Sequence, residues 1–224
     1  MARGLSQPLT LTMRSVPGDI PLHWTGKSPP SQLIEETTPL GPVQVPAGSF
    51  FQVNSAIASA LLTEFMNNLE HVDADRAIDM YGGVGLFGLA AALRGIPLVV
   101  VVDSDPAAAT AARNNAERLH LTGVKAESGT AEHRLERVLA AGKAHRTLLV
   151  VDPPRAGLSK PVVQSILENN PGTIAYVSCA PDTLTRDLKL LVTGGYAIRS
   201  TRLFDMFPCT PYFESLTWLR RPGI

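Results

Sequence analysis

Runs of apolar residues alternate with amphipathic stretches through most of the chain. Runs rich in β-branched and aliphatic residues, each ending at a polar or small residue, predict buried parallel strands over 77–81, 98–103, 148–152 and 174–178, with a weaker strand at 124–127. Apolar positions at helical spacing between them predict helices over 86–94, 106–119, 131–141, 159–168 and 183–192. This alternation predicts an α/β fold with a doubly wound, mostly parallel sheet and helices on both faces.

The two ends of the chain have a different pattern. Residues 1–48 contain eight prolines and short alternating stretches such as 9–13, which predicts an irregular segment with small strands or hairpins. Asn54 and Ser55 can cap a helix whose apolar residues continue to residue 69. The last two segments, 196–204 and 212–220, follow one another without a helix, so we expect an antiparallel pair at the sheet edge. A compact domain is therefore expected over 49–224, preceded by the segment 1–48.

Composition narrows the class of protein only slightly. The 224 residues are 45% hydrophobic and carry 20 basic and 20 acidic side chains, which suits one ordinary domain with an appendage and does not point to a polyanionic partner. Two cysteines are too few for a disulfide framework, a zinc site or an iron–sulfur cluster. The longest apolar run, 98–102, is too short for a signal peptide or a membrane span. We expect a cytoplasmic monomer with reduced thiols and no membrane contact.

A glycine-rich turn follows the first predicted strand, in the sequence Asp79-Met-Tyr-Gly-Gly-Val-Gly85. Ligands of such sheets bind beyond the carboxyl ends of the strands, and glycines let a ligand approach the backbone closely. The second strand ends at Asp103, whose carboxylate can accept hydrogen bonds from two ribose hydroxyls. The spacing lacks the third glycine of dinucleotide sites and favours S-adenosylmethionine over NAD. Alternatively, the glycines only build a turn and Asp103 caps a helix.

Two further strand ends carry chemically distinctive residues. Asp152 precedes two prolines and Arg155, so its carboxylate stands on a stiff turn and can accept N–H hydrogen bonds from a planar substrate. Cys179 lies between a strand and a predicted helix, where the helix dipole would favour the thiolate. A cysteine can also be a small buried apolar residue, and Cys209, which has no comparable setting, is interpreted in that way.

Five motifs together resemble the bacterial RNA m5U (uracil-C5) methyltransferases, which act on tRNA or 23S rRNA. They are Phe50-Phe-Gln-Val-Asn54, the turn 79–85, Asp152-Pro-Pro-Arg155, Tyr176-Val-Ser-Cys-Ala-Pro181 with Arg186-Asp187, and Asp205-Met-Phe-Pro-Cys-Thr-Pro-Tyr-Phe-Glu214. The resemblance covers residues 49–220 in the family's order. It implies a Rossmann-like class I S-adenosylmethionine-dependent methyltransferase fold.

The resemblance also implies roles for individual residues. Cys179 stands at the nucleophile that attacks uracil C6, and Glu214 at the base that removes the C5 proton. Asp152 and Gln52 stand at substrate-binding positions. With the glycine-rich turn, the expected cofactor contacts are Gln52, Asp79, Tyr81, Gly83, Gly85, Leu86, Asp103, Thr130 and Asp152.

Other residues keep two interpretations. Arg155 and Arg186 are either phosphate contacts or structural arginines that form salt bridges. Phe50, Tyr81 and Tyr212 are either stacking partners of a flipped base or part of the core.

Several features depart from the family pattern. Gly82 replaces a common non-catalytic cysteine, Ala180 replaces an asparagine after the nucleophile, and Tyr212 replaces a histidine before the base. The family's N-terminal RNA-binding barrel, larger inserted domain and iron–sulfur cysteines have no counterpart here, so residues 1–48 are expected to be a remnant of the inserted β domain. The expected partner is RNA, with 23S rRNA preferred over tRNA. The alternatives are a methyltransferase for a small molecule or protein, and a cofactor-binding fragment that is inactive alone.

Overall fold

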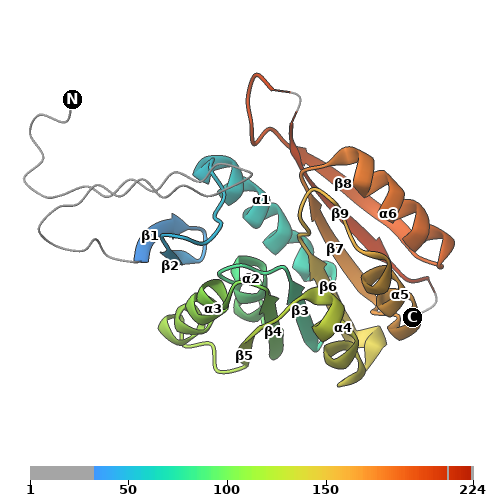
Figure 1. Cartoon of the computed structure of the whole chain (residues 1–224). Helices are drawn as coiled ribbons and strands as arrows, with labels where there is room; N and C mark the ends of the chain where they lie inside the picture. The colour runs from blue at the N-terminus through green and yellow to red at the C-terminus, as the bar shows by residue number, and fades with distance from the viewer. Residues whose placement is uncertain (1–32, 211, 223–224) are drawn as a thin grey trace, which may run out of the picture.

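The computed structural model describes residues 33–210 and 212–222. Within this part, a seven-stranded sheet has the order β5-β4-β3-β6-β7-β9-β8 (Figure 1). Its strands are β3 (Arg76–Met80), β4 (Leu98–Asp103), β5 (Val124–Ser128), β6 (Thr147–Val151), β7 (Thr173–Ser178), β8 (Ala197–Phe204) and β9 (Glu214–Arg220). Strands β3 to β7 are parallel, whereas β9 is antiparallel to both β7 and β8. The predicted antiparallel pair is therefore present, and β8 forms the edge of the sheet.

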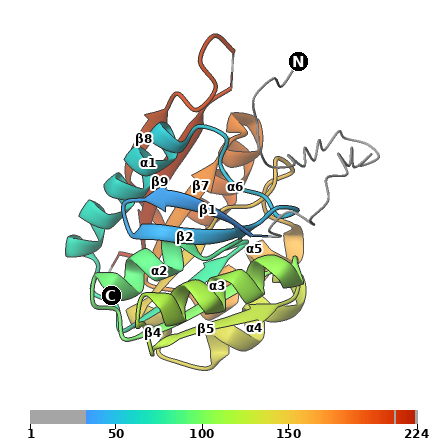
Figure 2. The ribbon, with the colours of Figure 1, turned by 90° about the vertical axis from the view of Figure 1, so that its left-hand side faces the viewer.

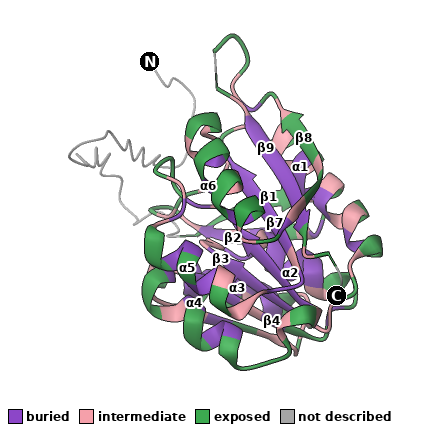
Figure 3. Ribbon diagram, turned by 90° about the vertical axis from the view of Figure 1, so that its right-hand side faces the viewer, coloured by how far each residue is buried: buried purple, intermediate pink, exposed green. Residues whose placement is uncertain are grey.

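Helices cover both faces of the sheet (Figures 1 and 3). One side is covered by α1 (Ser55–Asn68), α2 (Leu86–Leu93) and α3 (Pro106–Arg118). The core between these helices and the sheet includes Phe65, Leu89 and Ala112. The other side carries α4 (Ala131–Ala140), α5 (Lys160–Asn169) and α6 (Pro181–Thr193). Two short 3-10 turns, η1 (Leu69–His71) and η2 (Ala144–Arg146), complete the described helices. None of the helices in the described part is long and apolar enough to cross a membrane.

Local signals fix where the helices begin. The Asn54 side chain accepts a hydrogen bond from the Ile57 N–H at 3.3 Å, as expected for the cap of α1. Asp105 caps α3 by accepting from the Ala107 N–H at 2.8 Å, and Pro106 follows at the first helical position. Proline also stands at the start of α6, which begins two residues before the predicted helix.

Strand order reverses between β3 and β6, because the chain runs from β3 outward to β5 and then returns to β6 on the other side of β3. In open sheets this reversal opens a crevice beyond the carboxyl ends of the strands. The ends of β3, β4, β6 and β7 carry the glycine-rich turn, Asp103, Asp152 and Cys179, respectively. The topology therefore brings the candidate residues to one edge of the sheet.

A separate antiparallel hairpin, β1 (Leu33–Thr38) and β2 (Gly41–Pro46), precedes the main fold. Figure 2 shows it lying beside α2 and α3, outside the main sheet. Val43 and Val45 are buried against Val84 and Ala111. The hairpin agrees with the small strands expected before residue 48, whereas the stretch 9–13 lies outside the described residues.

Candidate active site

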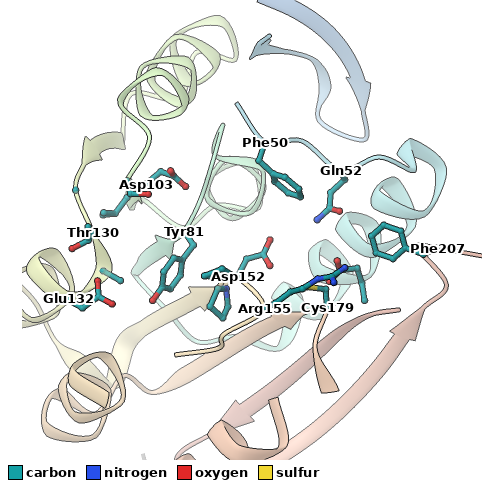
Figure 4. A pocket seen from close by; sticks show the side chains of 17 residues that line it. Phe50, Gln52, Tyr81, Asp103, Thr130, Glu132, Asp152, Arg155, Cys179 and Phe207 are labelled. Atoms are coloured by element: carbon teal, nitrogen blue, oxygen red, sulfur yellow. The ribbon is translucent and has the colours of Figure 1, made fainter. Parts of the chain in front are cut away.

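A cavity of about 580 Å³ opens at the carboxyl ends of β3, β4, β6 and β7 (Figure 4). This volume lies in the range of small-molecule and cofactor sites. Figure 4 shows Asp103 and Thr130 at one end, Tyr81 and Asp152 in the middle, and Arg155 and Cys179 at the other end. The polar and aromatic lining includes Phe50, Gln52, Tyr81, Asp103, Thr130, Glu132, Asp152, Arg155, Cys179, Phe207 and Glu214.

Asp103 is held in a fixed orientation at the end of β4. Its two carboxylate oxygens accept hydrogen bonds from the backbone N–H groups of Gly83 and Asp105, each at 2.8 Å. The helix cap of α3 is Asp105, so the interpretation of Asp103 as a mere cap does not hold. Gly83 has φ +54°, and a Cβ on it would meet nothing within 4 Å. The turn thus offers an open stretch of backbone beside an oriented carboxylate.

Asp79 lies behind this turn and not on the cavity wall. It is fully buried, one of its oxygens accepts from the Gly88 N–H at 2.8 Å, and the other has no partner within the described structure. Burial raises the pKa of Asp79 to about 7. A Cβ on Gly82 would lie 2.7 Å from a Val101 methyl carbon and 2.9 Å from the Asp79 carboxyl carbon, so this packing explains the glycine at position 82.

The other predicted cofactor contacts divide between two cavities. Gln52, Tyr81, Asp103, Thr130 and Asp152 line the large one. Gly83 and Leu86 line a smaller cavity of about 60 Å³ that shares Gln52, Tyr81 and Asp152 with it. Gly85 lines neither cavity; it is the N-cap residue of α2 and has φ +90°. The predicted set is thus brought to one region, but Asp79 and Gly85 shape it from outside.

Glu132 is a lining residue that sequence reasoning missed. It lies in the first turn of α4, next to Thr130, and its carboxylate accepts a hydrogen bond from the Ser159 hydroxyl at 2.8 Å. Hydrogen bonds from its own backbone N–H and from Ser159 hold the pKa of Glu132 below its usual range. The Thr130 hydroxyl lies 2.8 Å from Nδ1 of His133. The sequence did offer one signal for Glu132: a carboxylate four residues after the end of β5. The stretch carries no motif that would have singled it out.

Cys179 and Glu214 converge because β7 and β9 are antiparallel neighbours. Ser178 pairs with Ser215, so Cys179 and Glu214 follow as the next positions on the two strands. A hydrogen bond from the Ser215 hydroxyl to the Ser178 carbonyl, at 3.1 Å, fixes this end of the pairing. Both side chains line the same cavity although 35 residues separate them.

The electrostatic setting of Cys179 differs from the expected one. The thiol is half-buried, and this burial raises the pKa of Cys179, as do the charges of Glu214 and Asp152. Arg155 opposes these effects. The expectation of a favoured thiolate was wrong in direction, because desolvation and the charges of two carboxylates raise the pKa.

Glu214 is almost completely buried, with 4% of its surface exposed, and its Oε2 atom has no hydrogen-bond partner within the described structure. Burial and, to a smaller extent, the charge of Asp152 raise the pKa of Glu214 to about 7. Burial likewise raises the pKa of Asp152 to about 7, with a further contribution from Asp103. A carboxyl with a pKa near neutrality can both take up and release a proton at physiological pH.

Aromatic side chains line the cavity or contact its lining residues. Phe50 is 69% exposed and Tyr212 is 46% exposed, so neither belongs to the core, while Tyr81 is half-buried. The Arg155 guanidinium lies 4.6 Å from the centre of the Tyr212 ring, within the range of a cation–π interaction.

Arg186 has a structural role. It pairs with the buried Asp187 at 2.7 Å and donates to the carbonyls of Ala156 and Leu158, each at 3.0 Å. These contacts attach the loop after Asp152 to α6.

Cys209 is exposed with φ +65°, so the prediction that it is a buried apolar residue was wrong. It lies in the loop between β8 and β9, away from the core. In the described part, no group of three or more His, Cys, Asp or Glu side chains is arranged to hold a metal ion.

The sheet order, the glycine-rich turn and the carboxylate after β4 together define a Rossmann-like methyltransferase of the S-adenosylmethionine-dependent class. The tRNA m1G37 methyltransferase of M. jannaschii has this fold, with a TM-score of 0.62 and 16% identity. Residues 43–222 match the family described as tRNA (Uracil-5-)-methyltransferase, and the chain belongs to this family. The predicted fold and family are confirmed.

Individual relatives agree with this assignment. A Listeria innocua protein described as an uncharacterized RNA methyltransferase is 36% identical over 191 residues, which cover 84% of this chain and 41% of that protein. A similarly described Streptomyces coelicolor protein is 38% identical, covering 79% of this chain and 38% of the relative. The Pyrococcus abyssi tRNA (uracil-54, C5)-methyltransferase, solved with S-adenosyl-L-homocysteine, is 32% identical with a TM-score of 0.76 over 93% of this chain and 49% of its own. The chain thus spans about two fifths of its curated relatives.

Proposed function

We propose that this chain transfers a methyl group from S-adenosylmethionine to C5 of a uridine in RNA. The observation that carries the proposal is the pairing of Cys179 with Glu214 in one cavity, opposite the oriented carboxylate of Asp103. A methyltransferase for small molecules or proteins would have no need of a thiol and a carboxyl with these positions. Uracil needs both, because its C5 atom is a poor nucleophile until a nucleophile has added to C6.

The residues of the cavity suit S-adenosylmethionine. Asp103 keeps free lone pairs for the ribose hydroxyls, and the Gly83 backbone is open to close approach. Asp152 and Gln52 line both cavities and would contact the part of the molecule nearest to the uracil. Carboxylates at Asp103, Glu132 and Asp152 make the lining acidic, which favours a sulfonium cation. When bound, S-adenosylmethionine supplies the electrophilic methyl group.

Cys179 begins the reaction on the uracil. Its thiol gives up its proton to solvent, and the thiolate adds to C6, so that the electrons of the C5–C6 double bond move toward C5 and the C4 carbonyl. Arg155 assists because its positive charge lowers the pKa of Cys179 against the effects of burial and the carboxylates. Asp152 can accept a hydrogen bond from the uracil N3–H and hold the ring in the cavity. The activated C5 atom could then accept the methyl group that S-adenosylmethionine would supply, with cleavage of the methyl–sulfur bond and S-adenosylhomocysteine as the leaving group.

Glu214 completes the reaction. Its carboxylate removes the proton from C5, the C5–C6 double bond re-forms, and the bond between C6 and the Cys179 sulfur breaks, which releases the thiolate. A pKa of about 7 suits this step, because a base works best when its pKa lies near the working pH.

The target uridine must leave its stack to enter this cavity, so we infer a flipped base or a single-stranded loop as the substrate. Phe50 lines the cavity, and Tyr212 lies against the lining residue Arg155; both are exposed and can stack on the extruded base or a neighbour. Ribosomal 23S RNA stays the prediction from the sequence. Transfer RNA is the second candidate, because the family is described as tRNA (Uracil-5-)-methyltransferase and the P. abyssi relative acts on a tRNA uracil.

We also propose that residues 49–224 are the catalytic unit and that 1–48 belong to an inserted β domain.

The test is release of tritium from C5-labelled uridine in 23S rRNA and in tRNA, with S-adenosylmethionine as the methyl donor. We expect release from one of the two RNAs by the wild-type chain and none by Cys179→Ala. Cys209→Ser is the matched control, because Cys209 is the exposed second thiol, and it should retain release. If neither RNA releases tritium, the proposal fails for this chain.

A further inference from the structure

One buried amide side chain joins the β1–β2 hairpin to the glycine-rich turn. Asn115 of α3 is 1% exposed, and its Oδ1 atom accepts a hydrogen bond from the Gln44 N–H at 2.8 Å. Its Nδ2 atom donates to the carbonyls of Gln44 at 3.0 Å and of Val84 at 3.4 Å. Gln44 lies in β2, and Val84 lies between Gly83 and Gly85. A single side chain therefore connects the hairpin, the helix and the turn beside the proposed cofactor.

A second contact ties down the segment that follows the hairpin. The Ser49 hydroxyl donates to Oδ2 of Asp105 at 2.5 Å. Asp105 in turn donates its N–H to Asp103, the carboxylate assigned to the ribose. Phe50 and Gln52, which come directly after Ser49, line the large cavity. The contacts made by Asn115 and Ser49 therefore both reach the part of the large cavity near Gly83 and Asp103, which we call the cofactor end.

The hairpin depends on these attachments for its place. A two-stranded sheet alone is marginally stable in water at best. Its apolar anchors are Val43 and Val45 and, in the turn between the strands, Leu40, which is buried in the core beside α1. The exposed ion pair between Glu35 and Arg118 is of a kind that contributes little. The hairpin can therefore open without unfolding the main sheet, and its opening would loosen the wall formed by Phe50 and Gln52.

We propose that Asn115 is a positioning residue that couples docking of the β1–β2 hairpin to binding of S-adenosylmethionine. The hairpin and residues 47–52 form a movable wall of the cofactor end, which Asn115 and Ser49 hold closed. Because coupling between two binding events is reciprocal, the cofactor tightens the hairpin as much as the docked hairpin tightens the cofactor. This inference rests on the proposed function, since it needs the cavity to bind that molecule.

The amide of Gln44 reports directly on this coupling, because its N–H donates to Asn115. Hydrogen exchange is measured on the wild-type chain with and without S-adenosylhomocysteine, whose dissociation constant is measured by calorimetry. We expect the ligand to slow exchange of the Gln44 amide more than that of amides in β8, the far edge of the sheet. Asn115→Ala and Ser49→Ala should each raise the dissociation constant, the former about tenfold, a usual size for coupling between sites.

Asn114→Ala is the matched control, since Asn114 is the neighbouring half-buried residue of the same helix, and it should bind as the wild type does. If Asn115→Ala does not fold, the wild-type exchange pattern and Ser49→Ala still decide the matter. Tight binding with uniform protection of Gln44 and β8, or unchanged affinity in Ser49→Ala, would overturn the coupling alone. Absence of binding to the wild-type chain would overturn the cofactor assignment and this inference with it.

Discussion

Replacing Glu214 by glutamine should increase the stability of the chain relative to wild type as pH rises from 4 to 8, while removing its proposed activity. The carboxyl is 4% exposed, and one of its oxygens has no hydrogen-bond partner within the described structure. A buried carboxylate in such a site is costly, which is why the pKa of Glu214 rises from its ordinary 4.5 to about 7. Glutamine keeps nearly the same shape and carries no charge at any pH.

The sign and size of this change in stability follow from how tightly the folded and unfolded states bind the Glu214 proton. Between pH 4.5 and pH 7 the folded state holds the Glu214 proton more tightly than the unfolded state does, so the free energy of unfolding falls as pH rises through this window. The whole shift in the pKa of Glu214 corresponds to about 3 kcal/mol of unfolding free energy. Compared with wild type, Glu214→Gln should therefore gain up to this amount between pH 4 and pH 8. Any pH-independent difference in stability caused by exchanging a carboxyl oxygen for an amide NH2 group does not affect this gain.

The assay is urea unfolding of both proteins at several pH values from 4 to 8. The dependence of the unfolding free energy on urea concentration should be the same for both proteins, so that their stabilities can be compared. Glu136→Gln is the control, because Glu136 is exposed on α4, and it should show no such pH-dependent gain. A stability difference between Glu214→Gln and wild type that stays constant from pH 4 to pH 8 would refute the reasoning. Tritium release by Glu214→Gln should be undetectable, since the C5 proton then has no base.

Three other perturbations test the remaining parts of the site. In a Cys209→Ser background, Arg155→Met should slow alkylation of Cys179 by iodoacetamide severalfold at pH 8, because Arg155 opposes the raised pKa of the thiol; an equal or faster rate would contradict this role. Asp187→Ala should lower the free energy of unfolding, measured in urea, by at least about 3 kcal/mol. It leaves the buried Tyr176 hydroxyl and the Leu158 N–H, each now 2.7 Å from Asp187, without a hydrogen-bond partner. A loss below about 1 kcal/mol would contradict this role of Asp187. Asp103→Asn should weaken S-adenosylhomocysteine about 10-fold or more in calorimetry, and unchanged affinity would remove Asp103 from the cofactor site.

The order of the elements followed from local patterns. The strands β3, β6 and β7 were visible as apolar runs, because burial on both faces demands continuous apolar residues. The edge strand β5, in which only Ala126 is buried, gave the weaker pattern. The start of α1 followed from Asn54, whose cap needs only a partner three residues away. The motifs likewise placed Asp103, Asp152 and Cys179 at strand ends, and the topology then brought them together.

What the sequence could not supply were the contacts between distant residues. Asn115 reaches Gln44 across 71 positions, and nothing in the pattern of α3 distinguishes it from Asn114. The acidic surroundings of Cys179 arise from Glu214 and Asp152, which come from other strands, so the local helix end gave the wrong direction for its pKa. Cys209 could not be placed either, because its exposure depends on how the loop between β8 and β9 leaves the sheet.

The covalent step at Cys179 is the central claim, and trapping tests it most directly. Glu214→Gln, mixed with S-adenosylmethionine and uridine-containing substrate RNA, should accumulate a covalent complex, because the C5 proton that must leave before the thiol departs has no base. Its intact mass should equal protein plus RNA plus one methyl group, and the complex should be absent when Cys179 is also replaced by alanine. A methylated RNA product that forms in Cys179→Ala, or an adduct that persists without Cys179, would contradict the account.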